Sequence, residues 1–300
     1  MLKQVLFLLL ASCCSPCWGA FDFQSAHVLV VDEATGEVLL EKDSDTAAPI
    51  ASLTKLMTAM VVLDAHQDPD ELIRIEDADM DRLKHTRSGV RIGVTLARHT
   101  LLELALMSSD NHAAAALAGN YPGGLDAFAA ATDQKIQDLG LDHTALVEPT
   151  GLSSSNHSSA ADLVKILRAA ATYPEIGEIT SQRNDVVKVN GRQREFHNTN
   201  VLVGKPGWII LLSKTGFTNE AGRCLAMRLQ TEGRTVLVVL MGALATSKRA
   251  LDALNVHRWL AGEQPLLAQL GPAARRKFAA RGHRKPLRLA RSANVKRTDS

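Results

Sequence analysis

The spacing of apolar residues changes twice along the chain. Near the start, AHVLVVDEATGEVLLEK places two apolar runs around EATG, which predicts a β-hairpin with strands near 27–32 and 37–41. A middle part with helical spacing follows, and beyond about residue 180 the period of strands returns. The pattern therefore predicts sheet-forming segments towards both ends of the chain, with helices between them.

The first helix is predicted after Pro49, a residue that suits a helix start. In PIASLTKLMTAM the apolar residues recur at helical spacing, which places Ser52 and Lys55 side by side on the first turn. Further helices are expected on both sides of SSDN in LLELALMSSDNHAAAALAGN, over about 124–140, and over ADLVKILRAAATY. Residues 66–95 are polar and rich in turn formers, with short strands at most.

The last third of the chain has three apolar runs, WIILLSKTGFT, GRCLAMRLQTEG and RTVLVVLMGA, which predict consecutive antiparallel strands. SKRALDALNVHRWLAGE then resumes helical spacing up to Gly262. The simplest compact arrangement is an α/β (α+β) fold, in which one antiparallel sheet built from both ends is flanked by helices and carries an inserted helical lobe. A cleft between the two parts is the expected site.

The N-terminus MLKQVLFLLLASCCSPCWGA reads as a secretory signal, with a lysine before a short apolar run and small residues near Gly19. We expect a signal over residues 1–19, one domain over 24–262, and export to the periplasm. The alternative is a lipoprotein anchored through Cys13, because LASC resembles a lipidation box. Without the signal only Cys224 remains, which excludes an intramolecular disulfide and suits a small buried hydrophobe.

Charge is distributed unevenly along the 300 residues, whose overall net charge is +2. Residues 271–300 hold ten Lys or Arg and one Asp, a net charge of +9, so the preceding 270 residues carry −7. We expect residues 263–300 to form a basic, disordered tail. Such a tail can contact an anionic surface of the cell envelope or simply keep the protein soluble. Export argues against nucleic acid as a partner.

Three short motifs could carry chemistry. Ser52 and Lys55 form S-x-x-K, and Lys214-Thr215-Gly216 stands at the end of a predicted strand, where the glycine permits a close approach. The pattern S-x-N occurs at Ser109–Asn111, Ser154–Asn156 and Ser292–Asn294. Only Ser109-Asp110-Asn111 lies at an interruption between apolar helices, where a loop can be held over a cleft.

The order S-x-x-K, S-D-N and K-T-G is the signature of penicillin-binding proteins and class A β-lactamases. The chain resembles the low-molecular-mass penicillin-binding proteins, which are serine D-alanyl-D-alanine peptidases, and within them the endopeptidase branch (penicillin-binding protein 7-like). The resemblance runs from about Ala26 to Gly262. It includes YPGG, EPTGLSSSNHSSAADL, NTN and, most specifically, LSKTGFTNEAGRCLAM.

The resemblance implies catalytic roles for four residues. Ser52 would be the nucleophile and Lys55 its base, Ser109 would relay a proton to the leaving amine, and Asn111 would hold Lys55 and the substrate amide. The lysine acts as a base only when neutral, which needs its pKa lowered by roughly 3 from ~10.4. We expect burial to supply part of this and the charge of Lys214 to supply more, with no acid close by.

The resemblance also implies how a substrate is bound. The backbone N–H groups of Ser52 and Phe217 would form the oxyanion hole, and Lys214 and Thr215 would bind a carboxylate beside the scissile bond. Arg249 fits the family's additional carboxylate-binding arginine, although a solvated arginine at a helix start is an equally simple interpretation.

These roles imply a peptidase that cleaves D-Ala–diaminopimelate cross-links of peptidoglycan and is acylated by β-lactams. Removal of a terminal D-Ala is the main alternative. A β-lactamase is disfavoured because Glu148-Pro149 is followed by Leu152 where that class needs Asn, and a non-catalytic wall-binding module would not need all the motif residues. The ten histidines show no metal-ligand spacing, so we expect neither metal nor cofactor, and His112 is interpreted as helix surface.

Overall fold

The computed structural model describes residues 22–263, so the predicted signal and the basic tail beyond residue 263 lie outside the described part. The strands of the main sheet are β1 (His27–Asp32), β2 (Val38–Lys42), β9 (Ile209–Thr218), β10 (Gly222–Thr231) and β11 (Arg234–Ala243). The short strands are β3 (Ala48–Pro49), β4 (Leu72–Arg74), β5 (Thr95–Ala97), β6 (His157–Ser158), β7 (Asn184–Val189) and β8 (Arg192–His197). The helices are α1 (Thr54–Asp64), α2 (Arg98–Leu106), α3 (Asn111–Gly119), α4 (Gly124–Asp138), α5 (Ala160–Ala170), α6 (Pro174–Ser181) and α7 (Thr246–Leu260), with 3₁₀ turns η1 (Ala51–Leu53) and η2 (Asp77–Asp79).

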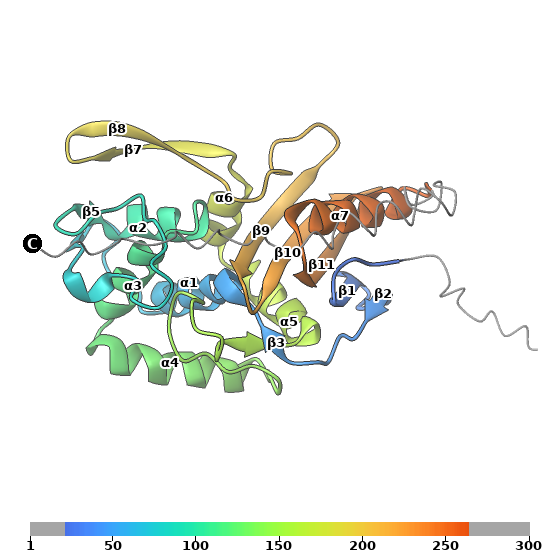
Figure 1. Ribbon diagram of the computed structural model, residues 1–300, viewed down its shortest axis with the longest axis horizontal. Helices are drawn as coiled ribbons and strands as arrows, with labels where there is room; N and C mark the ends of the chain where they lie inside the picture. Colours follow the sequence, from blue (N-terminus) through green and yellow to red (C-terminus); the bar gives the residue numbers. More distant parts are fainter. Residues whose placement is uncertain (1–21, 264–300) are drawn as a thin grey trace, which may run out of the picture.

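The main sheet is antiparallel, with the order β2-β1-β11-β10-β9. Its N-terminal hairpin pairs with the C-terminal meander through β1 and β11, so both ends of the described chain build one sheet (Figure 1). This confirms the predicted α+β architecture, and the three C-terminal strands are joined by turns at 219–221 and at Glu232-Gly233. Because β9 lies at an edge of the sheet, one side of it is free of strand partners and faces the rest of the molecule.

The sheet is buried on both faces, because successive side chains of a strand point to opposite sides. In β11, Leu237, Val239 and Met241 belong to the larger apolar cluster, which also contains the inner faces of α1, α2, α3 and α5. Val236, Val238 and Leu240 belong to a second cluster with the apolar side of α7. The predicted strand therefore has hydrophobic residues at every position rather than at every other one.

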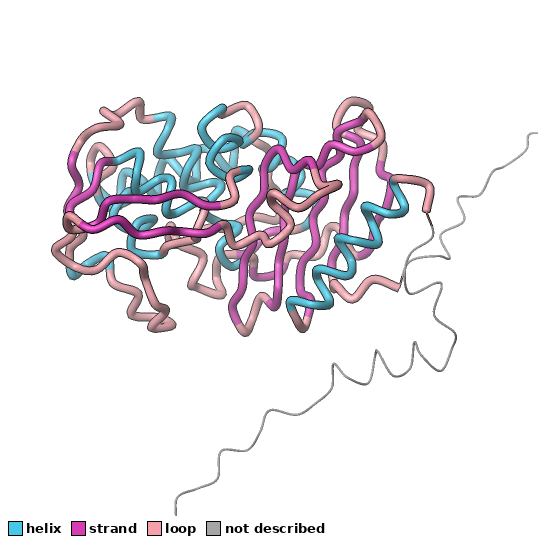
Figure 2. The backbone as a smooth tube through the Cα atoms, turned by 90° about the horizontal axis from the view of Figure 1, so that it is seen from above, coloured by secondary structure: helices cyan, strands magenta, loops and turns pink. Residues whose placement is uncertain are grey.

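The helical lobe (residues 54–138, α1 to α4) lies beside the sheet rather than on it (Figures 1 and 2). Its interruption at SSDN is confirmed, since α2 ends at Leu106 and α3 begins at Asn111. Asp110 forms the N-cap of α3, where its carboxylate accepts a hydrogen bond of 3.1 Å from the Ala113 N–H. The loop between the two helices is thereby held at its second half.

One predicted boundary is wrong. Pro49 lies in β3, where it pairs with His157, and the helix that follows begins at Thr54. The intervening Ala51 has a φ of 49°, in the left-handed region, which no residue of a right-handed helix can adopt. Ser52 consequently lies in a separate 3₁₀ turn that leads into α1.

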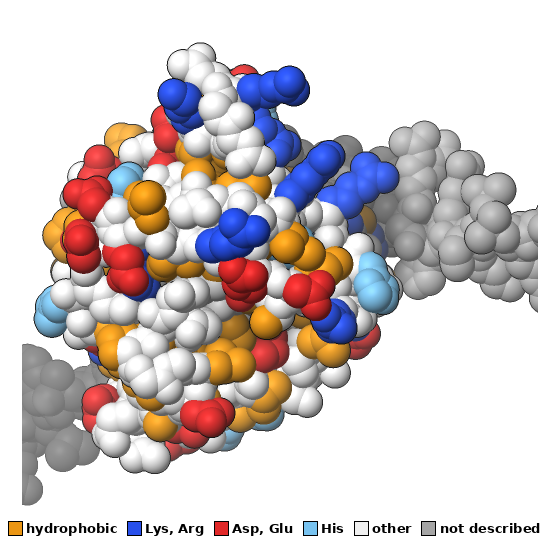
Figure 3. Space-filling model, turned by 90° about the vertical axis from the view of Figure 1, so that its left-hand side faces the viewer, with side chains coloured by type: hydrophobic (Ala, Val, Ile, Leu, Met, Phe, Trp, Pro, Cys, Tyr) orange, Lys and Arg blue, Asp and Glu red, His pale blue; other side chains and the backbone are white. Residues whose placement is uncertain are grey.

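A second difference is the hairpin of β7 and β8, which the sequence interpretation missed. It projects past the sheet over α2 and β5 (Figure 1). Its turn is Asn190-Gly191, both at positive φ, so the N-G dipeptide between alternating residues was the signal that could have identified it. Lys and Arg side chains gather at the top of Figure 3, where this hairpin lies, and its exposed cations are Lys188, Arg192 and Arg194.

Within residues 22–263, no helix has the length and apolar character needed to cross a membrane. The same residues hold no group of three or more His, Cys, Asp or Glu side chains arranged to bind a metal ion.

Candidate active site

The turn that carries Ser52 is packed tightly against two glycines. A Cβ on Gly216 of β9 would lie 2.8 Å from the Ile50 carbonyl oxygen and 3.1 Å from the Ser52 nitrogen. A Cβ on Gly151 would lie 1.9 Å from the Ala51 carbonyl oxygen. Real Cβ atoms do not approach backbone so closely, so only glycine permits this packing. The edge strand and the loop after α4 therefore fix the position of Ser52.

Lys55 lies one turn after Ser52 on α1, and its amine is the centre of the site. Its Nζ lies 3.0 Å from the Ser52 Oγ, 2.6 Å from the Asn111 Oδ1 and 2.7 Å from the Thr150 carbonyl oxygen. The side chain is 1% exposed, and no carboxylate forms an ion pair with it among the residues described. The predicted contacts of Lys55 with Ser52 and Asn111 are thus present in the structure.

Asn111 is oriented by residues that precede it by many positions. Its Nδ2 donates to the Thr86 Oγ1 at 2.7 Å, and the Thr86 hydroxyl donates to the Asp81 carboxylate at 2.6 Å. That carboxylate also accepts the backbone N–H groups of Leu83 and Lys84. Because the amide donates to Thr86, its oxygen must face Lys55. Asp81 and Thr86 are functional-site residues that the sequence interpretation missed.

Glu148 shapes the loop on the other side of Lys55. Its carboxylate accepts hydrogen bonds from the backbone N–H groups of Thr150 (2.8 Å), Gly151 (2.7 Å) and Ser153 (3.2 Å), and from the Thr150 hydroxyl at 2.5 Å. These four donors place the Thr150 carbonyl against Lys55. The arrangement explains why EPTG is part of the site, and it leaves Glu148 as a loop organiser rather than an acid–base group.

The K-T-G strand supplies a second buried cation. Lys214 is 1% exposed and donates one hydrogen bond of 3.2 Å, to the Thr215 carbonyl oxygen. The Thr215 hydroxyl is held by the Thr199 hydroxyl at 2.8 Å, which brings the NTN segment to the site. Lys214, Thr215 and Gly216 thus stand at the edge of the sheet beside the Ser52 turn.

Both amines have lowered pKa values, but not for the reason expected. Burial lowers the pKa of Lys55 to about 8, while the charges of Glu148, Asp110 and Asp81 act in the opposite direction. Burial, followed by the charge of Lys55, holds the pKa of Lys214 well below its usual range. The expectation that Lys214 dominates the pKa of Lys55 is wrong, because desolvation of the amine is the main cause.

Ser109 lies in the loop between α2 and α3 with a φ of 61°, in the left-handed region. Such a conformation costs a non-glycine residue about 1–3 kcal/mol and is kept where the surroundings enforce it. Ala51, beside the nucleophile, is strained in the same way. Both residues border the site, since Ala51 precedes Ser52 and Ser109 belongs to the S-D-N loop.

Phe217 and Arg249 border the site on the side of α7. The Phe217 ring is 47% exposed and lies directly after K-T-G. Arg249 is 6% exposed and donates to the Cys224 carbonyl oxygen at 3.2 Å, opposite Gly216 in the strand register. Arg249 is therefore buried at the sheet end, and its interpretation as a solvated arginine is wrong.

An ion pair joins the helical lobe to the sheet. Lys84 Nζ lies 2.6 Å from the Glu220 carboxylate, which follows β9, and this pair spans the two sides that carry Asn111 and Lys214. The hydrogen bond from Lys84 is the main cause that lowers the pKa of Glu220 to about 2.

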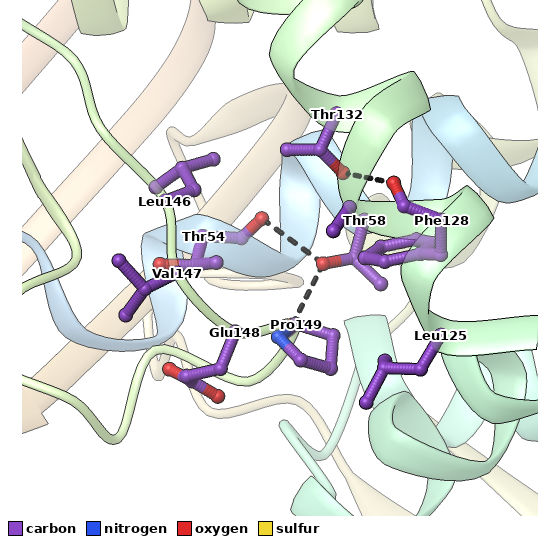
Figure 4. A pocket seen from close by; sticks show the side chains of 10 residues that line it. Thr54, Thr58, Leu125, Phe128, Thr132, Leu146, Val147, Glu148 and Pro149 are labelled. Carbon is purple, nitrogen blue, oxygen red and sulfur yellow. Dashed lines mark hydrogen bonds between the residues drawn. The ribbon is translucent and has the colours of Figure 1, made fainter.

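Two cavities adjoin the cluster. One of about 350 Å³ is lined by Asn111 and Thr150 and by the η2 region, including Met80 and Leu83. A smaller one of about 60 Å³ lies between α1, α4 and the Glu148-Pro149 segment, where Thr58 donates to the Pro149 carbonyl oxygen (Figure 4). The second cavity has no contact with Lys55 and is a packing feature.

Another sequence interpretation needs correction. His112 is 9% exposed rather than on the helix surface, and its Nδ1 lies 2.8 Å from the Val90 carbonyl oxygen. It packs behind the S-D-N loop without contacting Ser52 or Lys55. Cys224 is buried as expected, and burial raises its pKa to about 11.

The fold has solved counterparts. The Streptomyces K15 DD-transpeptidase superposes with a TM-score of 0.75 over 81% of this chain and 99% of that one, at 24% sequence identity. At this identity the likeness establishes the fold alone. The chain has the fold of the DD-transpeptidases and penicillin-binding proteins.

The sequence comparisons go further. The D-alanyl-D-alanine carboxypeptidase family, peptidase S11, matches residues 15–245. A D-alanyl-D-alanine endopeptidase of Escherichia coli is 42% identical over 241 residues, which cover 80% of this chain and 78% of the relative. One of Pseudomonas aeruginosa is 43% identical with the same coverage. The chain belongs to the peptidase S11 family and is a serine D,D-peptidase.

Proposed function

We propose that the chain is a D-alanyl-D-alanine endopeptidase that hydrolyses D-Ala–diaminopimelate cross-links through an acyl-enzyme on Ser52. The observation that carries the proposal is the 3.0 Å approach of the buried Lys55 amine, whose pKa is lowered, to the Ser52 hydroxyl, with no carboxylate of residues 22–263 ion-paired to that amine. Relatives of the same family at 42–43% identity bear the endopeptidase name, which supports this activity over removal of a terminal D-Ala.

In the proposed mechanism, neutral Lys55 removes the Ser52 proton as the oxygen attacks the carbonyl carbon of D-Ala. The N–H groups of Ser52 and Phe217 stabilise the oxyanion, an interaction in which one donor typically accounts for ~10²–10³ in rate. Ser109 passes the proton to the leaving amine, and the C–N bond breaks. Neutral Lys55 then takes a proton from a water molecule as the water oxygen attacks the acyl carbon. The ester bond to the Ser52 Oγ breaks, and the proton returns to that oxygen.

Substrate binding completes the assignment. The Asn111 Nδ2 donates one N–H to Thr86 and its other N–H to the substrate amide, and Lys214, Thr215 and Arg249 bind the carboxylate beside the scissile bond. β-Lactams present a carboxylate and a strained amide in the same arrangement, so they acylate Ser52. The four donors on the Glu148 carboxylate disfavour a β-lactamase, because they leave that group without a free position from which to activate water.

The decisive experiment is digestion of purified cross-linked muropeptides by the wild type and by Ser52→Ala, with products identified by mass. Conversion of dimers to monomers by the wild type alone is the expected result, and loss of the hydroxyl should reduce the rate by ~10⁶. Ser154→Ala, an exposed serine in the other described S-x-N element, is the matched control and should behave as the wild type. Full activity in Ser52→Ala contradicts the proposal, and loss of a single terminal alanine identifies a carboxypeptidase.

We propose the periplasm as the place of action, supported by the secretory pattern of residues 1–19. The basic residues of 263–300 are proposed to contact an anionic surface of the envelope. Mass measurement of the mature N-terminus distinguishes cleavage after Gly19 from a lipidated Cys13. Retention on anionic vesicles, lost on removal of residues 271–300, tests the second proposal.

A further inference from the structure

Two arginines near the end of the edge strand β9, Arg223 on β10 and Arg249 on α7, form no ion pair with an acid among residues 22–263. Arg249 is 6% exposed, and its Nε has no hydrogen-bond partner, although its Nη1 donates to the Cys224 carbonyl oxygen. Arg223, one residue before Cys224 on β10, forms no ion pair with any residue in 22–263. A buried guanidinium with unpaired N–H donors is energetically unfavourable. The end of β10 beside Arg249 is therefore suited to bind a hydrogen-bond acceptor.

The strand register places Arg223 beside the proposed carboxylate site. Arg223 lies opposite Phe217, and Thr215 points to the same face as Phe217 because alternate residues of a strand share a face. The Arg223 Cζ lies 3.4 Å from the centre of the Phe217 ring. Stacking of this kind holds the guanidinium plane in place and leaves its N–H edge free to donate.

The two cations act on each other. Burial, followed by the charge of Arg223, lowers the pKa of Arg249. The acids nearest to them along the chain are already engaged, because Glu220 pairs with Lys84 at 2.6 Å and Asp252 accepts hydrogen bonds from the N–H and hydroxyl of Ser25. Two adjacent guanidinium groups repel each other, and a ligand carboxylate would relieve that repulsion while accepting hydrogen bonds from both.

We propose that Arg223, held flat on Phe217, is a specificity-determining residue that binds a second carboxylate of the leaving peptide. The proposal rests on the D,D-endopeptidase function proposed above. It assigns the carboxylate next to the scissile bond to Lys214, Thr215 and Arg249, and a more distant one to Arg223.

The two possible leaving groups differ in the number of carboxylates that Arg223 and Arg249 could bind. A terminal D-Ala carries one carboxylate, whereas the stem peptide released from a cross-link carries a further acidic group on its glutamate residue. A second guanidinium therefore contributes to cross-link cleavage and contributes little to removal of a terminal alanine. Arg223 would thus favour cleavage of cross-links over removal of a terminal D-Ala, although both reactions use Ser52 as the nucleophile.

The test compares Arg223→Gln with the wild type on two substrates, a cross-linked dimer and a monomer ending in D-Ala-D-Ala. A lost charged hydrogen bond usually corresponds to about 10-fold or more in affinity. We expect kcat/KM for the dimer to fall by about that factor through KM, and kcat/KM for the monomer and acylation by benzylpenicillin to change much less. Arg192→Gln, the same change on the exposed β8, is the control.

A second substrate isolates the contact itself. This substrate is a dimer in which the glutamate carboxylate of the leaving stem is converted to the amide. The kcat/KM of the wild type for the amidated dimer should be lower than for the unmodified dimer by the same factor. The kcat/KM of Arg223→Gln should not fall further, as expected for a pair measured by a double-mutant cycle. An equal loss on dimer and monomer, or unchanged selectivity, overturns the assignment of Arg223. Those outcomes leave the endopeptidase function standing, because that function fails only if dimers are not cleaved through Ser52.

Discussion

At the scale of single residues, Lys55 is held in position by neutral groups rather than by an ion pair. Lys55 is surrounded by one hydroxyl, one amide oxygen and one carbonyl oxygen, all neutral acceptors that orient its amine. Among the described residues, the carboxylates of Glu148, Asp110 and Asp81 act on the charge of Lys55 from a distance, without an ion pair. Orientation without ion pairing lets the amine lose its proton while it remains directed at Ser52.

Acylation should depend on pH through Lys55. Its pKa is about 8, so the neutral form increases as the pH rises through that value. The second-order rate constant for acylation by benzylpenicillin should therefore rise about tenfold per pH unit well below the pKa and level off above it. Stopped-flow measurement between about pH 6 and 9.5 checks this, with circular dichroism at each pH as the control for folding. A flat profile contradicts the assignment of Lys55 as base.

The Ser52–Lys55 pair could be predicted from the sequence because helical spacing alone brings residues three apart together. The residues that hold this pair in place could not be predicted in the same way. Thr86 precedes Asn111 by 25 positions in a segment without regular structure, and Glu148 acts through a loop. Such contacts depend on tertiary packing that no local pattern encodes. The dominance of burial over the charge of Lys214 was missed for the same reason.

At the scale of elements, the edge strand β9 and the turn that carries Ser52 form one unit. Gly216 is the point at which a strand backbone meets the nucleophile turn. K-T-G was recognised in the sequence, but the reason for its glycine appears only in the structure. Because Gly216 has no side chain, the backbone of β9 approaches the Ser52 nitrogen closely enough for N–H groups of both segments to bind the same substrate oxygen.

Replacement of Gly216 by alanine should therefore slow acylation strongly while leaving the protein folded. The new Cβ would lie 2.8 Å from the Ile50 carbonyl oxygen, so the turn must move and the Ser52 N–H with it. Loss of one oxyanion donor predicts a drop of about 10²-fold or more in the rate of acylation by penicillin.

The matched control for this prediction is Gly177→Ala in α6. An added Cβ there meets only the Leu211 carbonyl oxygen at 3.5 Å, an ordinary contact. Acylation rates and thermal unfolding of both variants are measured together. If Gly216→Ala acylates as fast as Gly177→Ala, the close approach has no role in forming the oxyanion hole.

The elements that were predicted correctly are those with a strong period. The strands β9, β10 and β11 and the helices α4 and α5 follow uninterrupted apolar patterns. The hairpin of β7 and β8 has few buried residues, and its exposed cations mask the alternation. The helix boundary at Pro49 failed because packing of Gly151 and Gly216 on the Ala51 turn overrides the local preference.

At the scale of the whole molecule, both faces of the sheet are covered by apolar clusters, with α5 on one side and α7 on the other. The prediction of a sheet built from both ends succeeded because strand and helix periods differ clearly in this chain. The relation of the lobe to the sheet, including the Lys84–Glu220 ion pair, was beyond a single sequence.

Cys224 provides a test of how this interior opens. Its side chain is fully buried on β10, and burial raises the pKa of the thiol to about 11. Native protein should therefore react with a thiol reagent at Cys224 only through global unfolding, because β10 is an interior strand of the sheet.

The measurement is mass spectrometry of the peptide containing Cys224 after labelling at increasing urea concentration. Labelling should follow the same transition as far-ultraviolet circular dichroism. Labelling at a much lower urea concentration would indicate that the β9–β10 edge opens separately from the rest of the sheet.

The pairing of β1 with β11 also has a consequence for synthesis on the ribosome. The turn that carries Ser52 emerges early, and the strand that carries Lys214 emerges about 160 positions later. A chain truncated before Lys214 therefore cannot form the active site. Covalent capture by penicillin would then report that a newly made chain has joined its two ends, and truncated translation products would remain unlabelled.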